Sequence, residues 1–264
     1  MILLESGVKY FHKGSVNEVF AMNNISLEVK AGDFITIIGS NGAGKSTLLN
    51  SIAGTFFLDS GRITINLKDV TAWPEHKRAR FIARVFQDPL LGTCPSATIE
   101  QNMALAKKRG QWRGFSAGVK VKDRPFFREN LKLLDLGLEN RLLDRVGLLS
   151  GGQRQALTML MATMLKPEVL LLDEHIAALD PKTAGQILQL TRKIVAEQKL
   201  TTLMITHNMK HAIEYGNRLI MLHQGRIISD VSGEEKKNLT VDDLLNKFYE
   251  SSDEELVSDA MLLS

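Results

Sequence analysis

The segment GSNGAGKST carries the most specific chemical pattern in this sequence. It satisfies G-x-x-x-x-G-K-[ST], and it lies between an apolar segment, FITIIG, and a helix-like segment, GKSTLLNSIAG. Successive N–H groups of such a loop point into one concavity, and the dipole of the following helix adds positive potential there. The pattern therefore predicts a loop that binds phosphates. The predicted loop consists of Gly39, Ser40, Asn41, Gly42, Ala43, Gly44, Lys45, Ser46 and Thr47.

A nucleotide held by this loop needs a metal ion and a group that handles water. Lys45 is expected to reach the β- and γ-phosphates, and the Ser46 hydroxyl to ligate Mg²⁺. The segment VLLLDEH ends in a carboxylate pair, in which Asp173 is placed to hold Mg²⁺ and Glu174 to orient or deprotonate the attacking water. The alternative interpretation is that the Asp-Glu pair only caps the turn that follows it.

Two further polar residues each follow an apolar segment. Gln87 comes after RVF and is expected to reach both the metal and the water, while His207 comes after LMIT and is expected to face the γ-phosphate. A lone histidine at the end of a strand is more often a structural residue. Because the same sequence also contains a phosphate loop and the acidic pair, we favour a functional role for His207 over a structural one. Glu174, His207 and Gln87 are thus the predicted catalytic residues, with Ser46, Gln87 and Asp173 as metal ligands.

The stretch LLSGGQRQAL predicts a second helix start that suits an anion. Ser150 is a good N-cap, and Gln153 stands three residues later, where the partner of a capping box belongs. Gly151 and Gly152 allow the backbone to come close to a ligand. This segment has no lysine of its own, and a purely structural cap is the alternative.

Alternating apolar and helical patterns must position these residues. Short strands are expected in the first thirty residues, with a turn at Gly32, and a further strand pair around 61–66 and 84–87. Strands are also expected at 34–39, 168–173, 201–206 and 218–222, and helices at 44–54, 98–109, 126–138, 153–165, 182–197 and 209–216. Strands that alternate with helices predict a parallel sheet covered on both faces. The end, residues 251–264, is acidic without Lys or Arg and is expected to be a loose tail.

Composition limits the class of protein. The 264 residues carry a net charge of +3 and are 44% hydrophobic, which is ordinary for a soluble protein. One cysteine, Cys94, fits a reducing compartment, and no apolar run approaches the roughly 20 residues that cross a bilayer. The basic stretch 107–124 has spread charges and a single Trp112, which favours a solvated surface over nucleic-acid binding.

Taken together, these motifs resemble those of ATP-binding-cassette (ABC) ATPases. The phosphate loop, Gln87, LSGGQ, LLLDE, the Leu179–Asp180 pair in ALD, and His207 follow one another in the order and spacing of that family, over nearly the whole chain. The resemblance implies an α/β P-loop NTPase with a RecA-like core, an N-terminal antiparallel β-subdomain and an inserted α-helical subdomain. We expect one nucleotide-binding domain over 1–250, with the helical subdomain at about 92–150.

The resemblance also implies how the second anion site works. In this family the signature segment of one subunit, here Ser150, Gly151, Gly152 and Gln153, closes on the γ-phosphate held by another subunit. Asp180 would lie in the loop at the dimer interface. An aromatic residue near the N-terminus would stack on adenine, and we expect Phe11, with Tyr10 as the alternative. The family often has Pro and Thr/Ser where this chain has His175 and Ile176, and its signature helix is usually richer in arginine.

Three functional classes are compatible with a phosphate loop. LSGGQ and His207 argue against a generic kinase or GTPase, and a single cassette without a long coiled-coil insertion argues against a soluble role in translation or DNA repair. We expect the ATPase of a bacterial transporter, most similar to uptake systems with amino-acid-type permeases; an exporter of the lipoprotein-release type is the alternative. The expected partners are a second ATPase subunit, membrane permease subunits, and indirectly an extracytoplasmic solute-binding protein. The expected location is the cytoplasmic face of the membrane.

Overall fold

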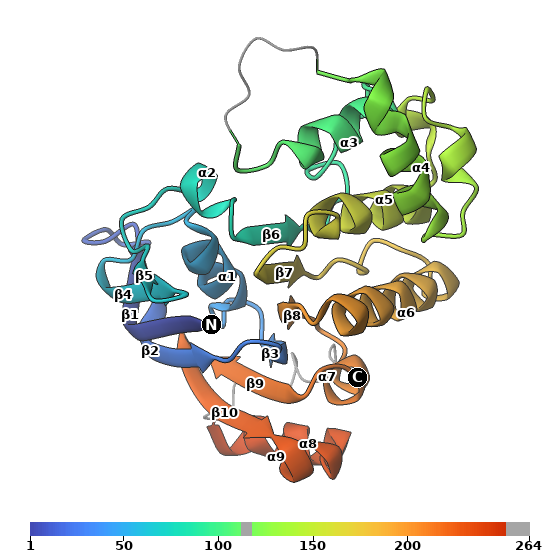
Figure 1. Cartoon of the computed structure of the whole chain (residues 1–264). Coiled ribbons are helices and arrows are strands. Elements are labelled where there is room, and N and C mark those ends of the chain that lie inside the picture. Colours follow the sequence, from blue (N-terminus) through green and yellow to red (C-terminus); the bar gives the residue numbers. More distant parts are fainter. Residues whose placement is uncertain (112–117, 252–264) are drawn as a thin grey trace. The chain divides into compact units, whose positions relative to one another are not determined.

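The computed structural model describes residues 1–111 and 118–251, which form two units (Figure 1). The first unit comprises residues 1–78 and 201–251, and the second comprises residues 79–200. Trp112 and the acidic tail from residue 252 onward lie outside the described residues. Among the described helices, none combines the length and the apolar composition that crossing a membrane requires.

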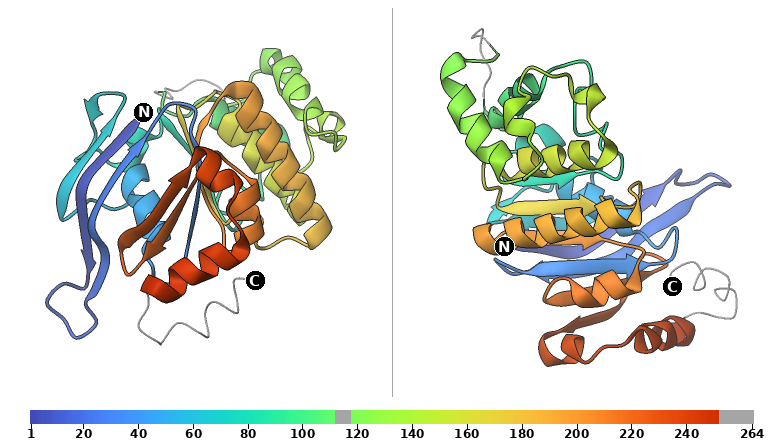
Figure 2. Two further views of the ribbon diagram at one scale, coloured as in Figure 1. Left: turned by 90° about the horizontal axis from the view of Figure 1, so that it is seen from below. Right: turned by 90° about the vertical axis from the view of Figure 1, so that its right-hand side faces the viewer.

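The first unit contains a four-stranded antiparallel sheet in the order β2-β1-β4-β5. Its strands are β1 (Ile2–Phe11), β2 (Val19–Val29), β4 (Ser60–Ile65) and β5 (Lys68–Asp69). In β2 the side chains of Ile25, Leu27 and Val29 are buried while those between them are exposed, as expected for a sheet with one covered face. The β1–β2 hairpin is the long dark-blue ribbon pair of Figure 2. The N-terminal antiparallel subdomain expected from the sequence is present.

A second set of strands in this unit runs in the order β10-β9-β3-β8. They are β3 (Phe34–Gly39), β8 (Thr201–Ile205), β9 (Arg218–His223) and β10 (Arg226–Ser232). Strand β3 is buried along its whole length and pairs in parallel with β8 and β9, which explains why these segments read as unbroken apolar runs. The helices of the unit are α1 (Lys45–Ala53), α2 (Glu75–Arg78), α7 (Met209–Glu214), α8 (Gly233–Lys237) and α9 (Val241–Ser251).

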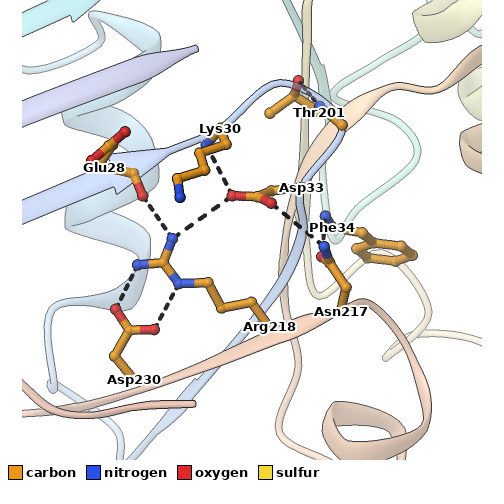
Figure 3. Close-up of polar contacts among 9 residues, drawn as sticks. Glu28, Lys30, Asp33, Phe34, Thr201, Asn217, Arg218 and Asp230 are labelled. Carbon is orange, nitrogen blue, oxygen red and sulfur yellow. Dashed lines mark hydrogen bonds and ion pairs between the residues drawn. The ribbon is translucent and has the colours of Figure 1, made fainter. Parts of the chain in front are cut away.

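An ionic network lies at the beginning of β3 and β9 (Figure 3). The Arg218 guanidinium donates to the Asp230 carboxylate at 2.6 and 2.5 Å and to the Glu28 carbonyl at 2.7 Å. The neighbouring Asn217 accepts from the Phe34 N–H through its side-chain oxygen at 2.8 Å. These contacts join β2, β3, β9 and β10, and a bidentate Arg–carboxylate pair adds geometric specificity. The network therefore fixes the start of the strand whose other end carries the phosphate loop.

Arg78 closes the opposite end of α1, the helix that follows the phosphate loop. Its side chain is fully buried and donates to the carbonyls of Ser51 and Ile52 at 2.7 and 2.9 Å. The remaining donors reach the carbonyls of Trp73 at 2.8 Å and Thr71 at 3.1 Å. Desolvation by burial lowers the pKa of Arg78 to about 10, so the group stays charged at neutral pH. A cation at a helix C-terminus satisfies carbonyls that the helix itself leaves without donors.

Arg78→Met is expected to lower the free energy of unfolding by about 2–4 kcal/mol, because four carbonyls lose a charged hydrogen-bond donor. Water cannot reach the buried carbonyls to replace that donor. Urea denaturation measures this. The matched control is Lys77→Met on the same short helix, whose side chain is exposed and which should change stability by less than about 0.5 kcal/mol. Equal effects of the two substitutions would contradict the assignment.

The second unit joins a short parallel sheet to a helical core. Its strands are β6 (Ile82–Val85) and β7 (Val169–Asp173), which pair in parallel. Its helices are α3 (Ile99–Lys107), α4 (Arg124–Lys132), α5 (Gly151–Thr163) and α6 (Pro181–Gln198), with single 3₁₀ turns at Val121–Asp123, Leu138–Asn140 and Val146–Leu148. Buried side chains of α3 and α4, among them Met103, Phe127 and Leu131, form one cluster with Leu157 and Leu160 of α5. The helical segment thus packs on the helix that follows LSGG.

Three expectations about elements were wrong or incomplete. The strands around 61–66 and 84–87 do not pair with each other, since β4 pairs with β1 and β5 while β6 pairs with β7. The helix expected at 126–138 is displaced, because α4 begins at Arg124 and ends at Lys132 and the chain reverses at Gly137, whose φ is +69°. The sequence analysis also predicted no element in the region of β10, α8 and α9. Apolar side chains of β10 and α9 pack against β3, β9 and α7.

Candidate functional site

The phosphate loop predicted from the sequence connects β3 to α1. Two of its glycines are required by close backbone approach. A Cβ on Gly39 would lie 2.3 Å from the Leu222 carbonyl oxygen, and one on Gly44, whose φ is +98°, would lie 2.4 Å from the Ala21 carbonyl oxygen. A side chain at either position would displace the loop from the strands beside it. The segment is therefore a tightly constrained turn that opens a helix, which is the context expected of a phosphate-binding loop.

Lys45 lies folded back over this loop. Its side chain is buried, and its ammonium donates to the carbonyls of Gly39 at 2.6 Å and Ser40 at 2.9 Å. The positive charge is therefore concentrated at the N-terminus of α1, where the helix dipole also favours an anion. A phosphate entering the loop would meet an ammonium group held in place by backbone carbonyls.

His207 follows β8, the strand that pairs in parallel with β3. The carboxyl ends of adjacent parallel strands meet at one edge of a sheet, so His207 lies at the same edge as the phosphate loop. The flanking residues fix its backbone. The Thr206 N–H donates to the Ile37 carbonyl at 3.2 Å, and Asn208 caps α7 by accepting from the His211 N–H at 3.0 Å. Within the first unit, the structure thus brings the predicted loop and the predicted histidine together.

Gln87, Asp173 and Glu174 gather in the second unit in the same way. Val85 of β6 is opposite Leu172 of β7, so the residues that follow the two strands lie side by side. Gln87 is exposed, and the acidic pair is partly buried. Glu174 adopts a positive φ of +47°, which is uncommon for a residue with a side chain. The second unit therefore places the Gln87 amide and the carboxylates of Asp173 and Glu174 at the carboxyl ends of β6 and β7.

Arg84 is a partner of Asp173 that the sequence analysis missed. Its guanidinium donates to the Asp173 carboxylate at 2.8 Å, and it lies 4.5 Å from the centre of the Phe86 ring. Both charged side chains are mostly buried. The available signal was a charged residue inside an otherwise apolar strand, IARV, because such a residue normally has a buried partner.

The donor groups of Ser46, Gln87 and Asp173 fit Mg²⁺ in kind. All three are oxygen ligands, which Mg²⁺ prefers over nitrogen or sulfur. Within the described residues there is no cluster of three or more His, Cys, Asp or Glu side chains that could hold a metal by itself. At nucleotide sites, Mg²⁺ is usually held by one or two side chains together with substrate phosphates and waters.

Ser150 begins α5 in a complete capping box. Its hydroxyl accepts from the Gln153 N–H at 3.2 Å, and the Gln153 side chain accepts from the Ser150 N–H at 3.2 Å. Ser150 therefore caps its own helix, as the structural interpretation requires, and both Ser150 and Gly151 are exposed at the surface. A Cβ on Gly152 would lie 2.2 Å from the Thr183 methyl group of α6. The glycine is therefore needed for α5 to approach α6.

Asp180 caps the start of α6, beside the LSGG segment. Its carboxylate accepts from the Thr183 N–H at 3.1 Å. Hydrogen bonds from the side chain and the backbone of Thr183 lower the pKa of Asp180. The structure therefore brings the predicted signature and the predicted interface aspartate together through Thr183, since this residue contacts both.

The two aromatic candidates differ in their surroundings. Tyr10 stacks on Phe20 with ring centres 4.3 Å apart and planes only 8° from parallel. Phe11 meets Phe56 edge-on, with ring centres 5.1 Å apart. The stacking surface of Tyr10 is thus partly used by another aromatic ring, while the Phe11 ring has the Lys9 ammonium over it, 5.7 Å from the ring centre.

Comparison with known proteins is consistent with this geometry. The sequence model of the family described as "ABC transporter" matches residues 22–177. A tyrosine transport ATP-binding protein of Clostridioides difficile is 48% identical over 235 residues, which cover 89% of this chain and 92% of that protein. The sulfate/thiosulfate import ATP-binding protein CysA of Mycobacterium tuberculosis is 35% identical over 214 residues, and the match covers 78% of this chain but only 56% of that longer protein.

Solved structures agree over most of the chain. A dimeric ATP-binding cassette in a post-hydrolysis state with bound ADP and Pi superposes with a TM-score of 0.74 at 29% identity, covering 88% of this chain and 98% of that one. Another cassette in its ADP conformation gives a TM-score of 0.77 at 28% identity, covering 96% and 99%. The fold expected from the sequence, an α/β P-loop NTPase with an antiparallel sheet and a helical segment, is confirmed.

Proposed function

This chain belongs to the ABC transporter family and is one of its ATP-hydrolysing, ATP-binding subunits, and we propose that it powers the uptake of an amino acid through separate membrane subunits. The observation that carries the proposal is the 48% identity, over 92% of its length, with a protein named for tyrosine transport. Other relatives are named for import of sulfate or transport of glycine betaine, carnitine and choline. We therefore favour import over export, and an aromatic amino acid as the substrate class.

In the proposed site, the loop from Gly39 to Thr47 binds the ATP phosphates and Phe11 stacks on adenine. Ser46, Asp173 and Gln87 would hold Mg²⁺, which would supply positive charge to the phosphate oxygens. Glu174 accepts a proton from the attacking water, and His207 stabilises the phosphate that is transferred. The constrained glycines of the loop and the oxygen-only donor set support these roles. The site belongs to a single nucleotide-binding domain over 1–250 with a helical insertion at about 92–150.

We also propose that two ATPase subunits, identical or paralogous, enclose two nucleotides. The signature residues Ser150 to Gln153 of one subunit would then contact the γ-phosphate bound by the other. Support comes from the exposure of Ser150 and Gly151 at a helix N-terminus and from their proximity to Asp180. The dimeric cassette among the similar structures supports the pairing of two subunits.

The membrane partner is proposed to bind the segment between Gln87 and α3, within residues 86–109. Leu90 and Leu91 follow Gln87 and are exposed, Leu91 to 69%, and Leu105 of α3 is exposed as well. Exposed apolar side chains in a segment that follows Gln87 are suited to contact with a protein partner. The subunit would thus work at the cytoplasmic face of the membrane, and the permease would receive its substrate from an extracytoplasmic binding protein.

Uptake of labelled tyrosine tests this function. In a strain deleted for the gene, the parental protein should restore uptake, while Lys45→Ala, made in equal amount, should leave uptake at the level of the deletion strain because the loop loses its phosphate-binding ammonium. Sulfate uptake serves as the specificity control and should not change. Normal uptake of tyrosine, phenylalanine and tryptophan in the deletion strain would refute the proposed substrate class.

A further inference from the structure

The backbone of Glu174 is held in a conformation that needs support from its surroundings. Its φ of +47° lies in the left-handed region, where a side chain is uncommon and costs free energy. The residue directly follows β7, and its carbonyl accepts from the Ala177 N–H at 3.0 Å. A strained residue persists only where neighbouring contacts over-determine it. The next residue, His175, supplies such contacts.

His175 is buried, with 1% of its surface exposed, and hydrogen bonds hold both its side chain and its backbone. Its Nε2 lies 3.1 Å from the Thr191 hydroxyl on α6, and its carbonyl accepts from the Gln155 side-chain amide on α5 at 2.6 Å. The Thr191 hydroxyl donates its single proton to the Ile187 carbonyl at 2.8 Å. With the Thr191 proton directed to the Ile187 carbonyl, the Thr191 oxygen is an acceptor, and we assign to His175 the tautomer that donates from Nε2.

We propose that His175 is a positioning residue that holds Glu174 for catalysis, with Thr191 and Gln155 as its anchors. The inference rests on the proposed role of Glu174 as the group that accepts a proton from water. Thr191 anchors the His175 side chain to α6, and Gln155 anchors the peptide that follows His175 to α5. A change of the Glu174 φ toward an ordinary value would move His175 and so break a buried hydrogen bond. The hydrogen bonds of His175 thus help to set the direction of the Glu174 carboxylate.

The structure offers a matched pair of substitutions to test this role. Thr191 and Thr163 are both buried, and both donate to the carbonyl four residues earlier in their helices, at 2.8 and 2.9 Å. Only Thr191 also accepts from His175. Thr191→Val and Thr163→Val therefore remove the same hydroxyl from similar surroundings, and the difference between them isolates the bond to His175.

Steady-state hydrolysis of Mg-ATP is the measurement. Thr191→Val is expected to lower kcat by about 10-fold with KM within about 2-fold, because a misdirected base slows chemistry without weakening phosphate binding. Thr163→Val should keep kcat within about 2-fold of the parent, and Thr191→Ser, which retains the acceptor, should do the same. Thr191→Val should lower the unfolding temperature more than Thr163→Val, because it also leaves the buried His175 Nε2–H without its acceptor, so kcat is compared at a temperature where both variants are fully folded.

Substitutions at His175 complete the test. His175→Gln can place an amide donor near the position of Nε2 and should keep most of the activity, while His175→Met removes the donor and should match Thr191→Val. In the His175→Met background, adding Thr191→Val should have no further effect on kcat, since the bond is already lost. Equal kcat for Thr191→Val and Thr163→Val, or fully additive effects at His175 and Thr191, would overturn the proposal.

The proposed role of Glu174 is checked separately. If Glu174→Gln is inactive while Thr191→Val hydrolyses ATP like Thr163→Val, the catalytic assignment stands and only the positioning role fails. If Glu174→Gln hydrolyses ATP at the parental rate, the catalytic assignment itself is wrong and the positioning role falls with it.

Discussion

Glu174→Gln is expected to bind ATP as tightly as the parent and to hydrolyse it at least about 100-fold more slowly. The amide has nearly the shape of the carboxylate but cannot accept a proton from water, while the phosphate loop and Asp173 are untouched. Because the enclosed nucleotide is not consumed, a dimer should accumulate. Size-exclusion chromatography with Mg-ATP should show this dimer, and chromatography with Mg-ADP should show the monomer.

The matched control for this substitution is Glu197→Gln, which makes the same chemical change at an exposed position of α6. It should hydrolyse ATP like the parent and form no stable dimer. If Glu174→Gln remained monomeric over a wide range of protein concentration with nucleotide bound, the proposed enclosure of ATP between two subunits would be wrong.

Ser150→Arg is expected to abolish hydrolysis while ATP binding by each subunit persists. The phosphate loop that binds ATP is intact, but a bulky side chain now occupies the helix start where the neighbour's γ-phosphate would dock. Loss of the cap also destabilises α5, by about 1 kcal/mol. The capping box seen in the structure therefore requires a control that separates capping from recognition in trans.

Ser150→Asp supplies that control. Aspartate is as good an N-cap as serine, so α5 should keep its stability. Its negative charge would nevertheless repel a γ-phosphate, so hydrolysis should still fall by more than about 10-fold. Ser150→Asn caps without a charge and should retain most activity. If Ser150→Asp were fully active, the segment would act only as a structural cap.

Mixing subunits shows whether the Ser150 segment acts in trans. Lys45→Ala subunits cannot handle phosphate but carry an intact signature, while Ser150→Arg subunits have the opposite defect. A mixed dimer contains one site with both defects and one with neither, so part of the activity should return. If heterodimers form and no activity returns, either the capping interpretation holds or both sites must work for turnover.

Sequence patterns predicted the elements that hold the candidate site because each is a local signal. The apolar run of β3, the glycines after it and the helix of Lys45 follow one another directly, so their order along the chain determines their contacts. The same holds for Ser150 and Gln153, whose capping box spans one helical turn. The roles of these residues in ATP hydrolysis remain predictions, which the substitutions above address.

The contacts that sequence patterns could not predict join residues distant in the chain. Arg84 and Asp173 are 89 positions apart, and Gln155 reaches the carbonyl of His175 across 20. Their partners depend on which strands and helices are adjacent, which local periodicity does not specify. A polar residue in an apolar strand indicates that a partner exists but does not identify it.

The carbonyl partners of Lys45 have a consequence for nucleotide exchange. Because the Gly39 and Ser40 carbonyls accept hydrogen bonds from the buried ammonium, they can compensate its charge when ADP departs. The loop can therefore keep its shape between one nucleotide and the next. Phosphate oxygens of incoming ATP then replace the two carbonyls as acceptors from the ammonium, and the loop does not have to fold around them. The conformational entropy of the loop is therefore lost once, when the protein folds, and not in each turnover.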